Sequence, residues 1–174
     1  MPDAHAITSF VGLQSHEVVR WKRHHKSWIE LWLAYRGRTY RCGRCGKGFP
    51  RRHDEKPICI RDLDIGTHRV FLWLPRYRVR CPRCGIRRVK SVIVRHGARC
   101  TRRFERKLFV LTDYMPVKAV AEQERVHWTT VKDSEIRYIL GLLRKRDLNG
   151  ITDLGIDEVS EKKGHRYLTL VTDT

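Results

Sequence analysis

The hydrophobic positions change their period along the chain, from the two-residue alternation of strands in the first part to the 3.6-residue repeat of helices after residue 100. Residues 17–21 and 28–35 are rich in β-branched and aromatic side chains, which predicts a β-hairpin with a basic turn at residues 22–27. Within residues 28–35 the better core face consists of Ile29, Leu31, Leu33 and Tyr35. Residues 1–15 have little periodicity, and we expect an irregular segment or a short strand there.

Two further strands are predicted at residues 58–65 and 68–74. The run from Val70 to Leu74 is entirely apolar, which indicates burial on at least one face. Pro75 follows it and lacks a backbone donor, so we expect the strand to end there. Residues 77–80 then form a separate short strand that leads into a pair of cysteines.

Residues 101–146 have helical periodicity. Phe104, Leu108 and Leu111 recur on one face and predict a helix over residues 101–113. Pro116 suits the first turn of a second helix, and a third begins at Trp128 and runs to about Arg144. Two helices joined by a short turn predict a helix-turn-helix, although the turn lacks the usual glycine.

In a helix-turn-helix the later helix enters the major groove of DNA with its N-terminus first. That geometry would put Thr129, Thr130, Lys132 and Asp133 near bases or phosphates, with Arg137 one turn further along. The alternative is an ordinary three-helix bundle without groove contacts. The helical pattern does not separate the two.

The last segment predicts a linker at residues 147–150 and then a β-hairpin, with strands at 154–160 and 165–173. Asp157 lies inside the apolar first strand. A buried carboxylate is costly unless it is paired or binds a metal ion. The alternative is an aspartate at a strand end that faces solvent or an arginine.

The charge of the chain is strongly positive, +18 over 174 residues, and it is concentrated in one region. Residues 36–100 hold 19 Lys or Arg and four Asp or Glu. A focused basic region of this kind is typical of nucleic-acid binding, with double-stranded DNA as the expected partner. A basic solvated surface or a ribosome-associated protein is the alternative. No apolar run reaches the length of a membrane span, so no membrane partner is expected.

Two Cys-x-x-Cys pairs are the strongest chemical signal in the sequence. They are Cys42 with Cys45 and Cys81 with Cys84, and each pair is followed by glycine. Four thiolates satisfy the tetrahedral coordination of Zn²⁺, which predicts a structural zinc site. Disulfides are the alternative, but no secretory signal peptide is recognisable, and thiols inside a cell stay reduced.

Three other residues carry side chains that can bind zinc. His53 lies between the pairs and could replace a cysteine, but four cysteines already suffice. Cys59 and Cys100 stand alone, and we expect them to be small buried residues or free thiols.

The fold class predicted from these patterns is α+β. A β-rich four-cysteine zinc ribbon precedes a helix-turn-helix and a terminal β-hairpin. The expected division of the chain is an N-terminal hairpin region at 1–35, the zinc ribbon at 36–100, the helix-turn-helix at 101–146, and a linker with hairpin at 147–174.

The order of these parts resembles the bacterial insertion-sequence transposases of the ISL-three family. The resemblance rests on the cysteine quartet, on the segment Ile60-Arg61-Asp62-Leu63 and on the hairpin around Asp157. It implies that the zinc ribbon and helix-turn-helix bind the terminal inverted repeats of a mobile element. It also implies that the final hairpin begins a ribonuclease-H-like nuclease of the DDE type, and that the protein is located in the bacterial cytoplasm in association with the nucleoid.

For Asp157 the resemblance implies the first of three carboxylates that hold two Mg²⁺ or Mn²⁺ ions during phosphoryl transfer. The sequence stops at Thr174, before the expected second and third carboxylates. Glu158 cannot replace them, because adjacent strand residues point to opposite faces. We therefore expect a C-terminally truncated chain that lacks catalysis by itself.

Three functions compete at this stage. The first is the DNA-binding half of a transposase, with a homodimer compatible with it. The second is a stand-alone zinc-dependent regulator that blocks a full-length enzyme at the element's ends. The third is a zinc-ribbon protein that binds RNA.

Overall fold

The computed structural model describes residues 4–13, 15–25, 27–145, 149, 153–162 and 166–173. The chain forms two compact units, residues 1–136 and residues 137–174, which are described separately. The α+β class is confirmed, with a β-rich first part, helices after residue 101 and a final two-stranded hairpin. Within the described residues, no helix is long and apolar enough to span a membrane.

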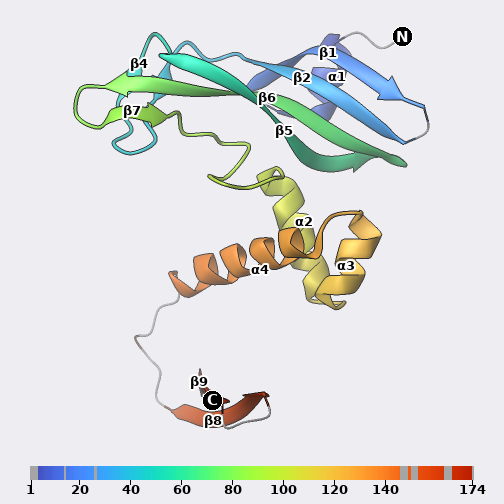
Figure 1. The fold of residues 1–174 in the computed structure, drawn as a ribbon, viewed down its shortest axis with the longest axis vertical. Coiled ribbons are helices and arrows are strands. Elements are labelled where there is room, and N and C mark those ends of the chain that lie inside the picture. Colours follow the sequence, from blue (N-terminus) through green and yellow to red (C-terminus); the bar gives the residue numbers. More distant parts are fainter. Residues whose placement is uncertain are drawn as a thin grey trace. The chain divides into compact units, whose positions relative to one another are not determined.

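A five-stranded sheet dominates the first unit (Figure 1). Its strands pair in the order β1-β2-β6-β5, and β7 pairs with the far end of β6. The bounds are β1 His16–His24, β2 Trp28–Tyr35, β5 Asp54–Ile65, β6 His68–Cys81 and β7 Gly85–Arg88. The pairing of β2 with β6 is parallel and the others are antiparallel, so the N-terminal hairpin and the segment between the cysteine pairs share one sheet.

The predicted N-terminal hairpin is confirmed. Strand β1 pairs with β2 from His16 opposite Tyr35 to His24 opposite Trp28, so its strands are longer than expected. Leu31 and Leu33 are buried, as the predicted core face requires.

The prediction for residues 1–15 was wrong, because Ala4–Val11 form helix α1. Ile7 and Val11 are one helical turn apart and pack against the core of the sheet. The Thr8 hydroxyl accepts a 2.8 Å hydrogen bond from the backbone N–H of Val18 in β1. Packing on the sheet therefore stabilises a helix too short to be stable alone.

The prediction that a strand ends at Pro75 was also wrong, because β6 continues to Cys81. Pro75 lies opposite Pro57 of β5, and neither residue has an N–H to donate. Two prolines can face each other only at a non-hydrogen-bonded pair, where each nitrogen points away from the partner strand. Strand β2 pairs with β6 only as far as Trp73, so Pro75 leaves no ladder bond unmade on that side.

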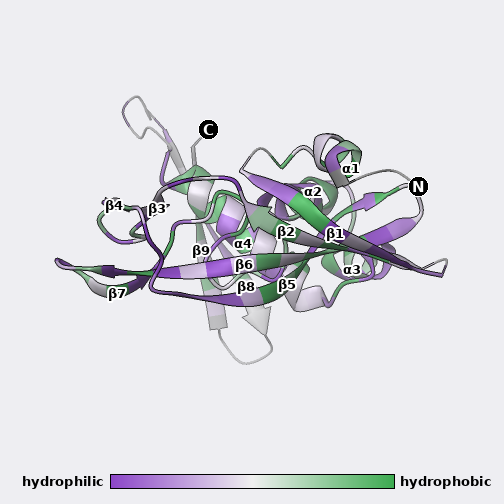
Figure 2. Cartoon of the chain, turned by 90° about the horizontal axis from the view of Figure 1, so that it is seen from above, coloured by the Kyte–Doolittle hydropathy of each residue, from purple (hydrophilic) through white to green (hydrophobic). Residues whose placement is uncertain are grey.

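Strand β6 changes character at this proline. Before it, Val70, Leu72 and Leu74 are buried in the core shared with α1 and β2. After it come Arg76, Arg78 and Arg80. Figure 2 shows the change as hydrophobic residues near β1 and β2 and hydrophilic residues toward β7.

Helices α2 (Arg102–Thr112), α3 (Val117–Glu124) and α4 (Trp128–Leu143) confirm the three predicted helices. The Thr101 side chain caps α2 by accepting from the N–H of Phe104, and Pro116 precedes the first residue of α3. The helices bury one compact core, made of Cys100, Phe104, Leu108, Val120, Ala121 and Val131.

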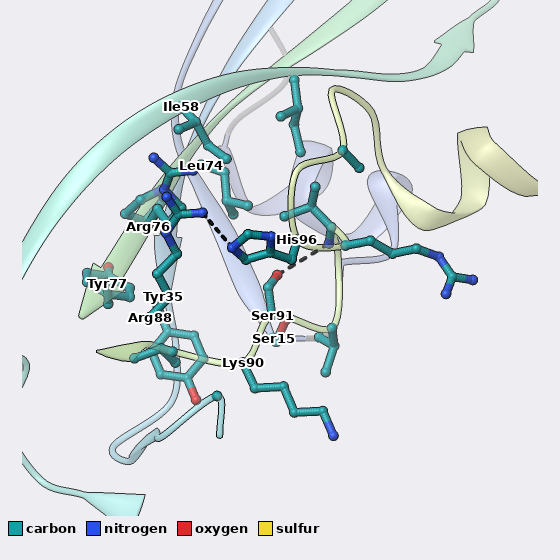
Figure 3. A pocket seen from close by; sticks show the side chains of 18 of the residues that line it. Ser15, Tyr35, Ile58, Leu74, Arg76, Tyr77, Arg88, Lys90, Ser91 and His96 are labelled. Carbon is teal, nitrogen blue, oxygen red and sulfur yellow. Dashed lines mark hydrogen bonds between the residues drawn. The ribbon is translucent and has the colours of Figure 1, made fainter. Parts of the chain in front are cut away.

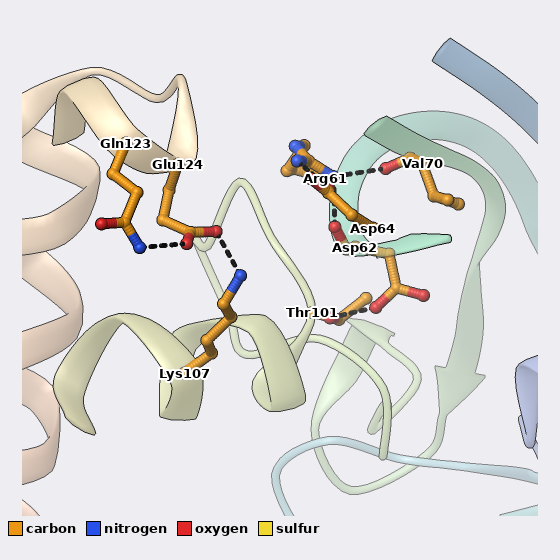
Figure 4. A network of polar contacts seen from close by, with 8 residues as sticks. All are labelled: Arg61, Asp62, Asp64, Val70, Thr101, Lys107, Gln123 and Glu124. Carbon is orange, nitrogen blue, oxygen red and sulfur yellow. Dashed lines mark hydrogen bonds and ion pairs between the residues drawn. The ribbon is translucent and has the colours of Figure 1, made fainter. Parts of the chain in front are cut away.

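A buried carboxylate joins the sheet to these helices. Asp62 of β5 has no exposed surface. It accepts a hydrogen bond of 2.6 Å from the Thr101 hydroxyl (Figure 4) and one of 2.7 Å from Nε of Arg103. Arg103 also donates to the carbonyl of Val11 at 2.6 Å, so this one group links β5, α1 and α2.

In the second unit, β8 (Leu154–Lys162) and β9 (Arg166–Asp173) pair antiparallel and confirm the predicted hairpin. Asp157 lies opposite Leu170 and its side chain is exposed. Residues 163–165, which include the predicted start of the second strand, lie outside the described residues.

We predict that Asp62→Ala lowers the free energy of unfolding of the zinc-loaded chain by about 1–3 kcal/mol, because the buried Thr101 hydroxyl and the half-buried Arg103 guanidinium lose their acceptor. Urea unfolding followed by tryptophan fluorescence measures this. The control is Glu55→Ala, which removes a surface pair with Arg52 worth at most about 1 kcal/mol. A loss below 1 kcal/mol for Asp62→Ala would contradict the linking role.

A second prediction concerns His16, which is buried beside Tyr35 and whose pKa burial lowers to about 4. Between pH 6.5 and 4 the unfolded chain takes up a proton that the folded chain excludes, so stability falls with pH by up to about 3 kcal/mol. His16→Gln should flatten this part of the stability–pH profile. His5→Gln, at an exposed histidine of α1, should leave it unchanged; equal profiles for both variants would refute the assignment.

Candidate metal centre and nucleic-acid interface

The four predicted cysteines meet in space. Their sulfur atoms all lie within 4.8 Å of one another, although 35 residues separate the two pairs. Cys42 follows β3 (Tyr40–Arg41), Cys81 ends β6 and Cys84 precedes β7. Sulfur atoms of opposite pairs come as close as 3.6 Å, between Cys45 and Cys81. Such a cluster fits one tetrahedral ion such as Zn²⁺.

Each pair lies on a tight turn that ends in a glycine with positive φ. Gly46 has φ +76° and Gly85 has φ +73°, a conformation that other L-residues rarely adopt. After the first turn, the Gly46 N–H donates to the Cys42 carbonyl at 2.9 Å. This folding of the backbone turns both sulfur atoms of a pair toward the same point.

The two turns are also tied to each other through Gly43. Its N–H donates to the carbonyl of Arg88, just after the second pair, at 2.9 Å. A Cβ atom at Gly43 would lie 2.6 Å from that carbonyl oxygen, so the close approach requires glycine. The short strand β4 (Gly48–Phe49) pairs with β3 and closes the first turn.

The thiols differ in their affinity for protons. Hydrogen bonds from the backbone N–H groups of Cys45 and Arg44 lower the pKa of Cys42 to about 7. Burial, and then the neighbouring Cys45 and Cys81, raise the pKa of Cys84 to about 12. Four adjacent thiolates repel one another, and a divalent cation among them removes that repulsion.

The other candidate ligands lie elsewhere. Among the described residues, His53, Cys59 and Cys100 are not members of the four-sulfur cluster. Cys100 is buried in the helical core, as expected for a small apolar residue, whereas Cys59 is exposed on β5.

The helix-turn-helix geometry is formed by α3, the residues 125–127 and α4. Arg125 ends α3 with φ 53°, the left-handed conformation that glycine commonly supplies at this point. Lys107 of α2 forms a 2.6 Å ion pair with the buried Glu124 and so fixes the end of α3 (Figure 4). Val131 and Ser134 are the buried positions of α4, which defines its inner face.

The predicted DNA-contacting residues all lie on α4. Thr129 and Thr130 are half-buried in its first turn, and Lys132 is exposed, with its ammonium 6.0 Å from the Trp128 ring centroid. The Thr129 hydroxyl lies 2.8 Å from Nδ1 of His127. Arg137 is further along the same helix. Contact of these residues with DNA stays a prediction.

Comparison with known proteins places these parts in one family. Residues 38–84 match the zinc-finger of transposase IS204/IS1001/IS1096/IS1165, and residues 91–133 match the helix-turn-helix domain of transposase family ISL3. The chain carries the zinc-finger and helix-turn-helix domains of the ISL3 transposase family. The predicted resemblance is thereby confirmed.

Curated relatives agree with this assignment. The transposase for insertion sequence element IS1001 of Bordetella parapertussis is 30% identical over 176 residues, which cover 99% of this chain and 43% of the relative. The transposase for insertion sequence element IS1557 of Mycobacterium tuberculosis is 36% identical over 137 residues, which cover 76% of this chain and 30% of the relative. The chain therefore spans less than half the length of these relatives. No solved structure matches it.

Sequence reasoning missed one feature of the zinc-finger region. A cavity borders the first cysteine turn, and it is lined by Arg76 and Arg88 on neighbouring strands. The alternation of arginines at 76, 78 and 80 marked one basic strand face. The cavity itself depends on residues 89–102 folding back beside that face, which the pattern does not predict.

We predict that Cys42→Ser abolishes stoichiometric metal binding and unfolds the residues around the cysteine turns, since ligand sets of this kind contribute about 10 kcal/mol or more to folding. Chelation of the wild-type chain should have the same effect. Metal content by mass spectrometry and thermal unfolding by circular dichroism measure both. Cys59→Ser is the matched control outside the cluster. Wild-type metal content and melting in Cys42→Ser would overturn the site.

Proposed function

We propose that this chain is the DNA-binding part of a transposase that recognises the terminal inverted repeats of an insertion sequence. The observation that carries the proposal is the N-terminal part of α4, where Trp128 and Lys132 are exposed while Val131 packs in the helical core, in the same unit as a basic sheet with four clustered cysteines. Family matches over both parts support it.

The division of labour follows from charge and geometry. The sheet and cysteine turns supply most of the positive charge, and arginine binds phosphate oxygens in a bidentate way without reading sequence. Helix α4 supplies Thr129, Thr130 and Lys132 for base edges and nearby phosphates. Arg137 would add a contact further along. Two copies bound as a homodimer would bring two element ends together.

Asp157 has a separate role in the proposal. We infer that it is the first metal-binding carboxylate of a nuclease domain, to be completed in a full-length enzyme with Mg²⁺ or Mn²⁺. Its exposure on the β8–β9 hairpin supports this, because a ligand must reach its ion. The proposal assigns no catalysis to residues 1–174 alone.

Selection of bound sequences from a random duplex library tests the proposal. The zinc-loaded chain at about 150 mM salt, near physiological ionic strength, should enrich one motif. That motif should match the inverted repeats that flank the gene. Tight binding without enrichment would reduce the chain to a phosphate binder, and preference for single-stranded RNA would favour an RNA-binding protein.

A substitution in α4 distinguishes DNA contacts made by this helix from the general attraction of DNA to a basic chain. Lys132→Ala should weaken binding to the selected duplex and lower the slope of log affinity against log salt by about 0.9 if the ammonium neutralises one phosphate. Arg106→Ala removes an equal charge from an exposed position on α2 and should leave the slope unchanged. Equal slopes for the two variants would remove α4 from the interface.

A further inference from the structure

A cavity of about 690 Å³ lies in the first unit, between the sheet and the segment that connects it to α2. It lies beside residues 74–77 in the middle of β6, and residues between 88 and 99 supply its other side. Figure 3 shows Arg76, Arg88 and His96 around the same space as Ile58 and Leu74. The volume falls within the range of small-molecule sites, roughly 300–1,000 Å³, and far exceeds what a phosphate ion alone would fill.

The charged side chains that line the cavity are all basic. It includes no Asp or Glu among the described residues. Its basic side chains are Arg41, Arg76, Arg88, Lys90, Arg95, Arg99 and Arg102. Arg95 of this lining forms a 2.9 Å ion pair with Glu105, which itself does not line the cavity. A cavity built in this way favours an anion.

Arg76 and Arg88 are the centre of this charge. Arg76 is half-buried, and burial together with the nearby charge of Arg88 lowers its pKa. The Arg88 guanidinium lies 2.9 Å from Nε2 of His96, which holds its orientation. The positive charges of two neighbouring guanidinium groups repel each other. A phosphate between them would offset this repulsion and accept bidentate hydrogen bonds from both groups.

Part of the wall is apolar. Ile58 of β5 and Leu74 of β6 line it next to Arg76, and Pro75 and Val92 also belong to the lining. Such a surface suits a sugar or a base rather than a second phosphate. A base that is paired and stacked in a duplex cannot enter a concave site, so the occupant must be unpaired.

We propose that this cavity binds one unpaired nucleotide of a DNA strand, with its phosphate on Arg76 and Arg88 and its base or sugar against Ile58 and Leu74. The choice of a DNA strand over a free nucleotide rests on the proposed function. The site is separate from α4, and it would hold a frayed or single-stranded nucleotide while α4 reads the adjoining duplex.

The test compares a blunt duplex with the same duplex carrying two unpaired 3′ nucleotides, bound to the zinc-loaded chain. The overhang should raise affinity about tenfold, a typical value for charge-assisted hydrogen bonds to one phosphate. Deoxyadenosine monophosphate should reduce the affinity gained from the overhang at lower concentration than inorganic phosphate does. Equal affinity for the two duplexes would overturn the proposal.

Matched variants locate the effect. Arg76→Gln should abolish the affinity gained from the overhang. Arg76→Lys should keep only part of this gain, because lysine has the charge but not the bidentate hydrogen-bonding geometry of arginine. Arg80→Gln removes the same charge four residues further along β6, outside the cavity, and should keep the full increment. Equal losses in Arg76→Gln and Arg80→Gln would show general electrostatics and refute a defined site.

The two proposals fail separately. The overhang increment is measured on a duplex of arbitrary sequence, so it does not need sequence reading by α4. If selection finds no motif while the increment depends on Arg76, the cavity stands and end recognition falls. If the overhang adds nothing but deoxyadenosine monophosphate weakens duplex binding by the wild-type chain and not by Arg76→Gln, the site binds free nucleotides and not a strand, which overturns the proposal as stated.

Discussion

Four sulfur atoms within 4.8 Å of one another are the constraint on which the first half of this chain depends. Around them the buried hydrophobic set is only Cys42, Val79 and Cys81, too small a core to hold the cysteine turns by apolar burial alone. A cation bound among the thiolates would replace that missing core, because it would bind the folded arrangement and not the open chain. It would also fix the Cys81 end of β6 and with it the basic face beyond Pro75.

A second constraint is the buried carboxylate of Asp62, which connects the sheet to the helices. The carboxylate is inside the protein, and its partners come from α2 and the residue that caps it. A buried charge of this kind stabilises mainly by being fully paired, so it fixes one arrangement of β5 against α2 and penalises others. The orientation of the helix-turn-helix within the first unit therefore depends on a residue of the zinc-finger region.

The arginines of the first unit differ in the charge of the groups that they contact. Those that hold the fold together face carboxylates, as Arg103 faces Asp62 and Arg95 faces Glu105. At the cavity, Arg76 and Arg88 instead lie near each other, and Arg88 contacts His96. A strongly basic chain tolerates such repulsion only because water and salt screen it, and a nucleic-acid phosphate removes it. Paired arginines are structural, and like-charged neighbours indicate where an anion belongs.

The sequence by itself determined the local features of this protein: the cysteine quartet, the hairpin strands and the three helices. Each depends on residues close together in the chain, such as Cys42 with Cys45, or the repeat of Phe104, Leu108 and Leu111. Where the sequence prediction failed, a distant partner decided the outcome. Residues 4–11 are helical because Ile7 and Val11 pack on the sheet, and β6 passes through Pro75 because Pro57 lies opposite. The buried state of Asp62 and the cavity beside Arg76 exist only once segments far apart in sequence meet, because burial and repulsion between charges are properties of the folded chain.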